Sequence, residues 1–176
     1  DVAAEYANYN ADLTRTIPAN GKFTPRQRAV YAAVLRILRL CIDQLIVPGK
    51  HLKKEYHPEM ARALEEELIA LGLLEADTVA AERAEAHLPE EKRAYRKYMM
   101  HGVSHSLGLD VHDVTPTDPV FVENMIVTVE PGIYLPDERF GIRLENDIVV
   151  RRGGNIDLMA SVPIGPDEIE ALMARD

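Results

Sequence analysis

The sequence has a single cysteine, no tryptophan, no long apolar run and too few basic residues to balance its acids. Cys41 alone cannot form a disulfide within the chain, which is typical of proteins from a reducing compartment, and we therefore expect a cytoplasmic location. The longest apolar runs, such as Val30–Leu35, fall far short of the ~18 residues that cross a bilayer, so no membrane association is expected.

The charge balance argues against a further class of protein. The chain has 176 residues, with 20 Lys and Arg against 29 Asp and Glu, and its formal net charge is −9. Proteins that bind nucleic acid normally present a basic face, so nucleic acid is not an expected partner. Hydrophobic residues make up 47% of the chain, enough to bury a core, and this length is typical of one domain.

The order of the elements predicts an α+β domain. The sequence indicates a hairpin within residues 1–16, then helices, then a strand-rich region, then a short helix. Thr24 is a candidate N-cap followed by Pro25. The expected helices start at Pro25, run from about Pro58 to Leu73, and start at Pro166, with residues 75–99 a helix, a connector or both. The expected strands are Met125–Val129 and Ile142–Val150, with turns at Pro131-Gly132, Pro136-Asp137 and Gly153-Gly154.

Polar residues interrupt apolar stretches at four places, and two of these lie in the first two thirds of the chain. Asp1 and Asp12 can face each other on one side of the expected hairpin, where they would repel unless a cation lies between them. His101, His105 and His112 fall within 12 residues. A helix would place His101 and His105 on one face, as in some zinc sites, whereas the neighbouring glycines favour an irregular path.

The other two places lie in the strand-rich region. Glu130 ends an apolar strand, where an acid is costly to bury unless it is paired or bound to a metal. Alternation places Arg143 and Glu145 on the same face of one strand. Taken singly, these residues fit solvated acids, hydrogen-bonded histidines or a salt-bridged sheet edge. Taken together, two Asp, two Glu and one His suit two divalent metals, with Mn²⁺, Co²⁺ and Zn²⁺ as candidates.

These residues stand in motifs that resemble those of the pita-bread metallopeptidases of family M24, especially Xaa-Pro aminopeptidase (aminopeptidase P) and prolidase. The similarity covers nearly the whole chain. Its segments are Asp-x₄-Tyr-x₅-Asp-Leu-Thr-Arg-Thr, His-Gly-Val-Ser-His-x-Leu-Gly-Leu-Asp-Val-His-Asp-Val, Thr-Val-Glu-Pro-Gly-Ile-Tyr and Gly-Ile-Arg-Leu-Glu-Asn-Asp-Ile-Val-Val. One departure is Asn124, where the family often has a glycine.

The resemblance implies a role for each candidate residue. His101 and His112 would orient the scissile carbonyl and stabilise its developing oxyanion, Glu130 would also move the proton, Arg143 would lie near the metal carboxylates, and Tyr134 would lie close to the pocket. The implied metal ligands are Asp1, Asp12, His105, Glu130 and Glu145, with Asp12 and Glu145 bridging two ions.

The implied activity is removal of the N-terminal residue from peptides with proline at position two, through a hydroxide that bridges two divalent ions, with Mn²⁺ expected first. Prolidase activity and a non-catalytic binding module of the same fold are the alternatives. The resemblance also implies that residues 1–176 are the C-terminal catalytic part of a larger enzyme. The rest of that domain and a separate N-terminal domain would precede residue 1, or another chain would supply them, and a homo-oligomer is expected.

Overall fold

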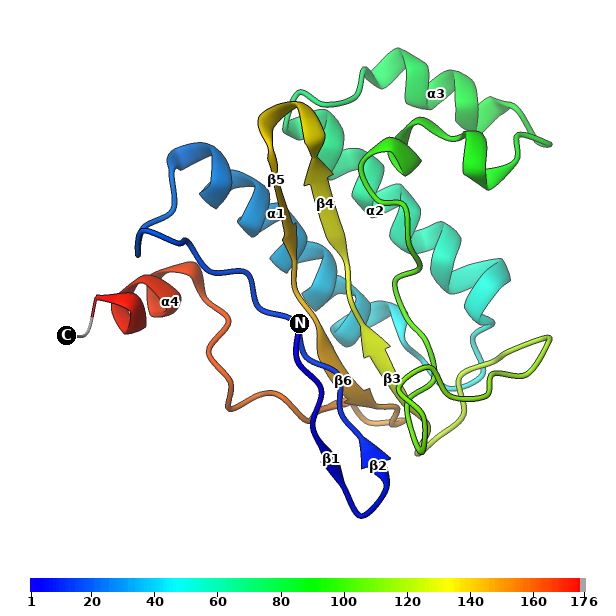
Figure 1. Ribbon diagram of the computed structural model, residues 1–176. Coiled ribbons are helices and arrows are strands. Elements are labelled where there is room, and N and C mark those ends of the chain that lie inside the picture. The colour runs from blue at the N-terminus through cyan, green and yellow to red at the C-terminus, as the bar shows by residue number, and fades with distance from the viewer. Residues whose placement is uncertain (175–176) are drawn as a thin grey trace.

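The computed structural model describes residues 1–174 and has the expected α+β order; the last two residues of the domain expected over residues 1–176 lie outside the described part (Figure 1). The helices are α1 (Pro25–Leu40), α2 (His57–Ala70), α3 (Ala76–Ala84) and α4 (Pro166–Met173). The strands are β1 (Glu5–Tyr6), β2 (Tyr9–Asn10), β3 (Ile126–Val129), β4 (Gly132–Leu135), β5 (Phe140–Arg143), β6 (Asn146–Val149) and β7 (Ile156–Asp157).

A long antiparallel ribbon forms the centre of the fold. Strand β3 pairs with β6, and β4 pairs with β5. The pairing of Val129 with Asn146 and of Gly132 with Arg143 follows one register, so the ribbon continues across the break between the two pairs. The break falls at Pro131, which has no N–H to donate, although its carbonyl still accepts a bond from the N–H of Leu144 at 3.3 Å.

This register corrects two expectations. The turn expected at Pro131-Gly132 is wrong, because the chain continues from β3 into β4. The single strand expected over Ile142–Val150 is also wrong, because β5 ends at Arg143 and β6 begins at Asn146. Between them, the N–H of Glu145 points away from the opposite strand of the ribbon and bonds to the carbonyl of Thr14, so the N-terminal arm pairs with the outer edge of the ribbon here.

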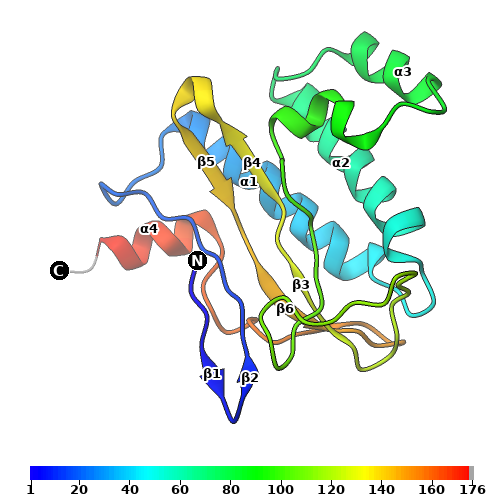
Figure 2. The same cartoon turned by 45° about the vertical axis from the view of Figure 1, so that its right-hand side comes forward.

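Alternation gives the ribbon one apolar and one polar face. The apolar face packs on α1, with α2 beside it, and both views show these helices on the same side of the ribbon (Figures 1 and 2). Its side chains are almost completely buried; they are Val127, Val129, Ile133, Leu135, Ile142, Leu144 and Ile148. The polar face carries the candidate site residues of this region.

The helices begin and end close to the expected positions. Thr24 caps α1 as expected: its hydroxyl accepts the N–H of Gln27, and the side chain of Gln27 accepts the N–H of Thr24. The helical path continues beyond Leu40 as a π-helical turn, Cys41–Leu45, and a second π-helical turn, Leu52–Tyr56, leads into α2. Residues 75–99 hold both a helix, α3, and a connector with short 3₁₀ turns.

The expected N-terminal hairpin is present but short. Ala7 and Asn8 both have positive φ, which is typical of a tight two-residue hairpin turn. Asn124 has φ 72°, the left-handed conformation that a glycine adopts easily, so asparagine serves where the resembling family often has glycine. No helix within residues 1–174 combines the length and the apolar character needed to cross a bilayer.

Candidate metal centre

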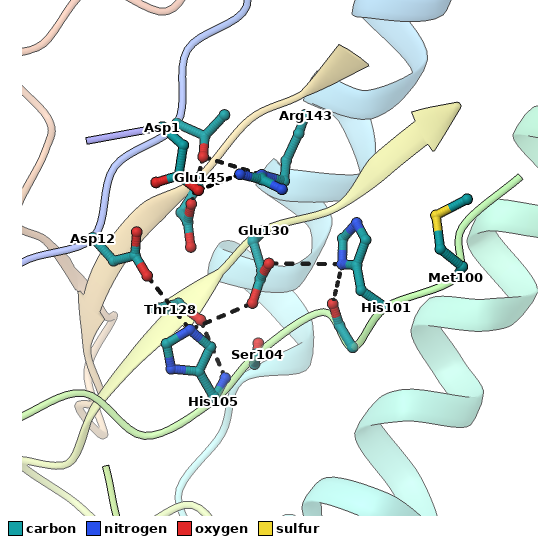
Figure 3. Close-up of polar contacts among 12 residues, drawn as sticks. Asp1, Asp12, Met100, His101, Ser104, His105, Thr128, Glu130, Arg143 and Glu145 are labelled. Atoms are coloured by element: carbon teal, nitrogen blue, oxygen red, sulfur yellow. Dashed lines mark hydrogen bonds and ion pairs between the residues drawn. The ribbon is translucent and has the colours of Figure 1, made fainter. Parts of the chain in front are cut away.

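All eight site residues expected from the sequence line one cavity of about 390 Å³. They come from three separate parts of the chain: the N-terminal arm, the irregular loop 99–125 and the polar face of the ribbon. Figure 3 labels all of them except His112. Two further residues, Gly102 and Ser104, complete the lining. The eight residues are Asp1, Asp12, His101, His105, His112, Glu130, Arg143 and Glu145.

The ribbon brings two carboxylates directly opposite one another. Because β3–β4 and β5–β6 share one register, Glu130 lies across from Glu145, and both side chains point to the polar face. Glu145 is 2% exposed. Its Oε2 accepts the hydroxyl of Thr14 at 2.6 Å, which fixes the orientation of the carboxylate.

Asp12, His105 and Glu145 form the tightest group. Each offers one ligand atom, and these three atoms lie within 4.8 Å of one another. Glu130 adjoins the group, since its Oε1 is 3.5 Å from Nε2 of His105, and Oδ2 of Asp12 is 3.6 Å from the same nitrogen. These distances are too long for good hydrogen bonds, so the two carboxylates lie beside Nε2 without being bonded to it.

The hydrogen bonds of His105 fix which ring nitrogen is free. Nδ1 lies 3.0 Å from the carbonyl oxygen of Ser106, which can only accept, so Nδ1 carries the hydrogen. In the neutral ring Nε2 then has a free lone pair directed toward carboxylates. A histidine whose N–H is held by a backbone carbonyl, with its other nitrogen among acids, is typical of a metal ligand.

Asp1 lies at the rim, outside the tight group. Its carboxylate is paired with the guanidinium of Arg143, whose Nε donates to the hydroxyl of Thr14 at 3.1 Å. The register of the hairpin places Asp1 and Asp12 on the same side as expected, but diagonally rather than directly opposed. Arg143 and Glu145 also share one side, as expected, although the strand breaks between them.

His101 is held on both sides of its ring. Nδ1 donates to the carbonyl of Gly102 at 2.6 Å, and Nε2 accepts the hydroxyl of Tyr134 at 2.7 Å. Tyr134 reaches this position because its ring lies over Gly132 and Gly141, where a Cβ would come within 3 Å of ring atoms. The His112 side chain is exposed, with its ring 4.2 Å from that of His105 between centroids, so it forms part of the rim.

Burial and neighbouring charges shift the pKa values of the acids in and beside the cavity. Burial raises the pKa of Glu130 to about 8, and the charges of Glu145 and Asp12 add to the effect while Arg143 opposes it. Burial also raises the pKa of Glu145, and it raises the pKa of the neighbouring Asp147 to about 7. Burial lowers the pKa of His101, which favours its neutral form.

The donor set fits divalent metal ions. Several carboxylates converge with Nε2 of one imidazole, and among the described residues only the Arg143 guanidinium lines the cavity as a permanent cation. Such a group of acids is electrostatically unfavourable by itself and becomes favourable around a cation. Carboxylate oxygens with one imidazole suit hard or borderline metals.

Sequence reasoning did not single out the residues that hold these side chains in place. Thr14 bonds Glu145, Ser104 bonds the buried hydroxyl of Tyr56 at 2.8 Å, and Asp147 accepts the N–H of Asp12 at 3.0 Å. For Asp147 a signal existed, because a residue two positions after Glu145 in a strand faces the same side. For Thr14 and Ser104 the contacts depend on chain segments far apart in the sequence.

An α+β fold whose ribbon and adjoining loop present paired carboxylates and a histidine to one cavity defines a candidate metalloprotein. The chain belongs to metallopeptidase family M24, whose family model matches residues 1–152. This confirms the resemblance to the pita-bread metallopeptidases, and with it divalent metal ions as the class of cofactor.

Similar proteins agree with this membership. The chain is 41% identical to Xaa-Pro aminopeptidase of Escherichia coli over 185 residues, which cover 98% of this chain and 40% of that protein. It is 35% identical to Xaa-Pro aminopeptidase 3 of Homo sapiens, covering 99% of this chain and 34% of that protein. The chain therefore spans about two fifths or less of the length of these relatives.

Solved structures agree with the fold. Aminopeptidase PepP of Pseudomonas aeruginosa matches with a TM-score of 0.81 at 39% identity, over 97% of this chain and 39% of that one. A zinc-substituted aminopeptidase P of E. coli in complex with product matches with a TM-score of 0.81 at 40% identity, over 98% and 40% of the two chains. The pita-bread assignment is thus confirmed for the part of the fold that this chain contains.

Proposed function

We propose that this chain is the metal-binding part of an aminopeptidase that removes the N-terminal residue from peptides with proline at position two. The observation that carries the proposal is the single cavity lined by two Asp, two Glu and three His from three distant segments. The similarity to Xaa-Pro aminopeptidases supports this substrate class over the dipeptides that prolidase cleaves.

The proposed ligands are Asp1, Asp12, His105, Glu130 and Glu145. Two divalent ions bound there would supply Lewis acidity and lower the pKa of a shared water. We assign Mn²⁺ as the native ion because the donors are mostly carboxylate oxygens, with Co²⁺ and Zn²⁺ as the competing choices.

The other residues act on the substrate and on protons. Glu130 accepts the proton of the attacking water and passes it to the leaving proline nitrogen, a role open to a carboxylate that lines the cavity. His101 and His112 orient the scissile carbonyl and stabilise the oxyanion that develops on it. Arg143 holds Asp1 at the rim through its ion pair.

The whole enzyme extends beyond this chain in the proposal. Residues 1–176 form the C-terminal catalytic part, and the rest of the domain and an N-terminal domain lie in the same polypeptide or in a partner. The exposed N-terminal arm, where residues 1–9 all face solvent, supports a covering segment. We further propose a homo-oligomer and a cytoplasmic location, the latter because Cys41 is a free buried thiol.

A peptide series tests the proposal on the complete enzyme loaded with Mn²⁺. The substrates are an Xaa-Pro-Xaa tripeptide, the matched Xaa-Ala-Xaa tripeptide and the Xaa-Pro dipeptide. Release of the first residue from the proline tripeptide alone is the expected result. Preference for the dipeptide would indicate a prolidase, and no cleavage of any peptide by metal-loaded enzyme would support the non-catalytic alternative.

A further inference from the structure

Asp147 is a further carboxylate at the centre and has no place in the proposed ligand set. It lies on β6, two residues after Glu145, and the register places it opposite Thr128 on the polar face of the ribbon. The side chain is buried, with the residue only 1% exposed. It does not line the cavity, so it lies behind the ligands rather than among them.

The contact made by Asp147 is with the backbone of a proposed ligand. Its Oδ2 accepts the N–H of Asp12 at 3.0 Å, a bond between residues 135 positions apart in the sequence. Within residues 1–174, this is the only hydrogen bond from a side chain to the backbone of Asp12. Its loss would remove the direct link between Asp12 and the ribbon.

The N-terminal arm needs such a link. Its first nine residues are all exposed, so burial does little to hold them. From Asp12 onward the arm is joined to the ribbon by this bond and by bonds of the next residues, Thr14, Arg15 and Thr16, to Arg143 and Glu145. The Thr14 bonds fix one end of the segment, and the Asp147 bond fixes the ligand residue itself.

A buried carboxylate costs free energy unless its oxygens are hydrogen-bonded, so Asp147 would be unfavourable if its side chain only filled space. The other carboxylate oxygen of Asp147, Oδ1, has no hydrogen-bond partner within the described residues. Buried polar groups without a full set of hydrogen bonds are commonly found next to functional sites, where they hold another residue in place.

We infer that Asp147 is a positioning residue, which holds Asp12 at the distance from His105 and Glu145 that a shared metal ion requires. The inference rests on the proposed function, because it takes Asp12 as a ligand. Asp147 does not line the cavity, and it acts through the backbone of Asp12. Residues that support metal ligands in this way typically change metal affinity about 10–100-fold when they are lost.

Two substitutions in the complete enzyme distinguish the effect of losing the hydrogen-bond acceptor of Asp147 from the effect of losing its charge. Asp147→Asn keeps an oxygen at the same reach, whereas Asp147→Ser leaves a hydroxyl too short to reach Asp12. We expect Asp147→Ser to weaken Mn²⁺ binding, measured by calorimetry, about 10–100-fold, and Asp147→Asn to retain most of the affinity. In the metal-free proteins, hydrogen exchange at the Asp12 amide should be faster in the serine variant alone.

Glu65→Ser is the matched control, since Glu65 is also a buried acid, 2% exposed, and pairs with Arg83 far from the cavity. It should lower the unfolding temperature without changing Mn²⁺ affinity. Wild-type affinity in Asp147→Ser, or unchanged exchange at the Asp12 amide, would overturn the inference and leave the proposed function standing. Wild-type protein that binds no divalent ion would overturn the proposed function and the inference together.

Discussion

Two carboxylates that face each other across a strand pair repel unless a cation lies between them. Glu130 and Glu145 are such a pair, and Asp12 adds a third acid from the N-terminal arm. Nε2 of His105 faces these acids, while its Nδ1 donates to the carbonyl of Ser106. At the scale of single residues, the repulsion among these acids therefore lowers the stability of the metal-free fold, which is typical of a metal site without its ion.

Glu145→Ala in the complete enzyme tests the ligand assignment. The loss of a carboxylate from the proposed ligand set should abolish peptidase activity. It should also weaken metal binding more than the loss of a supporting residue, which typically costs about 10–100-fold. The measurements are peptide hydrolysis and metal content after dialysis. Glu65→Ala, an equally buried glutamate far from the cavity, is the control and should keep both. Retained activity and metal in Glu145→Ala would remove Glu145 from the ligand set.

A second prediction concerns pH in the metal-free protein. Burial raises the pKa of Glu130 to about 8, above its ordinary value of 4.5. Between these values the folded protein keeps a proton that the unfolded chain has lost, so this contribution to stability is lost as pH rises. Thermal unfolding with a chelator should show a midpoint that falls from about pH 5 to about pH 8 and then levels off.

The matched variant for this prediction is Glu130→Gln, which cannot ionise. Its midpoint should fall less steeply over the same range, with the remaining slope due to the raised pKa values of Glu145 and Asp147. Equal slopes in the two proteins would contradict the assigned cause.

Much of the residue-level site was predictable because polar residues within apolar segments are costly and therefore informative. Glu130, Glu145 and the three histidines belong to this kind, and all line the cavity. The supporting role of Thr14 was not predicted, because it depends on backbone pairing between Thr14 and Glu145, which lie far apart in the sequence. Sequence alternation reports which side a residue faces, but not which segment packs against that side.

At the scale of the elements, local signals predicted helix starts well. The Thr24-Pro25 signal located the start of α1, because capping depends on residues that are neighbours in the sequence. The strand break at Leu144-Glu145 was not predicted. It depends on Pro131 in the opposite strand and on Thr14 from the N-terminal arm, and neither is adjacent in sequence.

Thr24→Ala tests the cap of α1. The change removes the hydroxyl that accepts the N–H of Gln27 and should lower the free energy of unfolding by about 1 kcal/mol. Chemical denaturation measures this difference, and metal affinity should not change because the cap lies outside the cavity. Thr78→Ala is the control, since Thr78 is an exposed residue within α3. An equal loss of stability in both variants would contradict the capping role.

At the scale of the whole molecule, the centre exists only in the folded chain. Its residues extend from Asp1 to Glu145, and the segments that carry them meet through the ribbon and the bonds of the N-terminal arm. A ligand that binds only the folded state stabilises it by mass action. Metal binding and folding should therefore be coupled, and a chelator should lower the unfolding temperature of the loaded protein.

The most direct test of this account is the metal content of the complete enzyme after loading with Mn²⁺ and removal of free ions. Elemental analysis should give about two ions per catalytic site, the number that shared carboxylates are suited to hold. The unfolding temperature should rise together with the metal content. Protein that retains no divalent ion, with an unfolding temperature unaffected by Mn²⁺, would contradict the account.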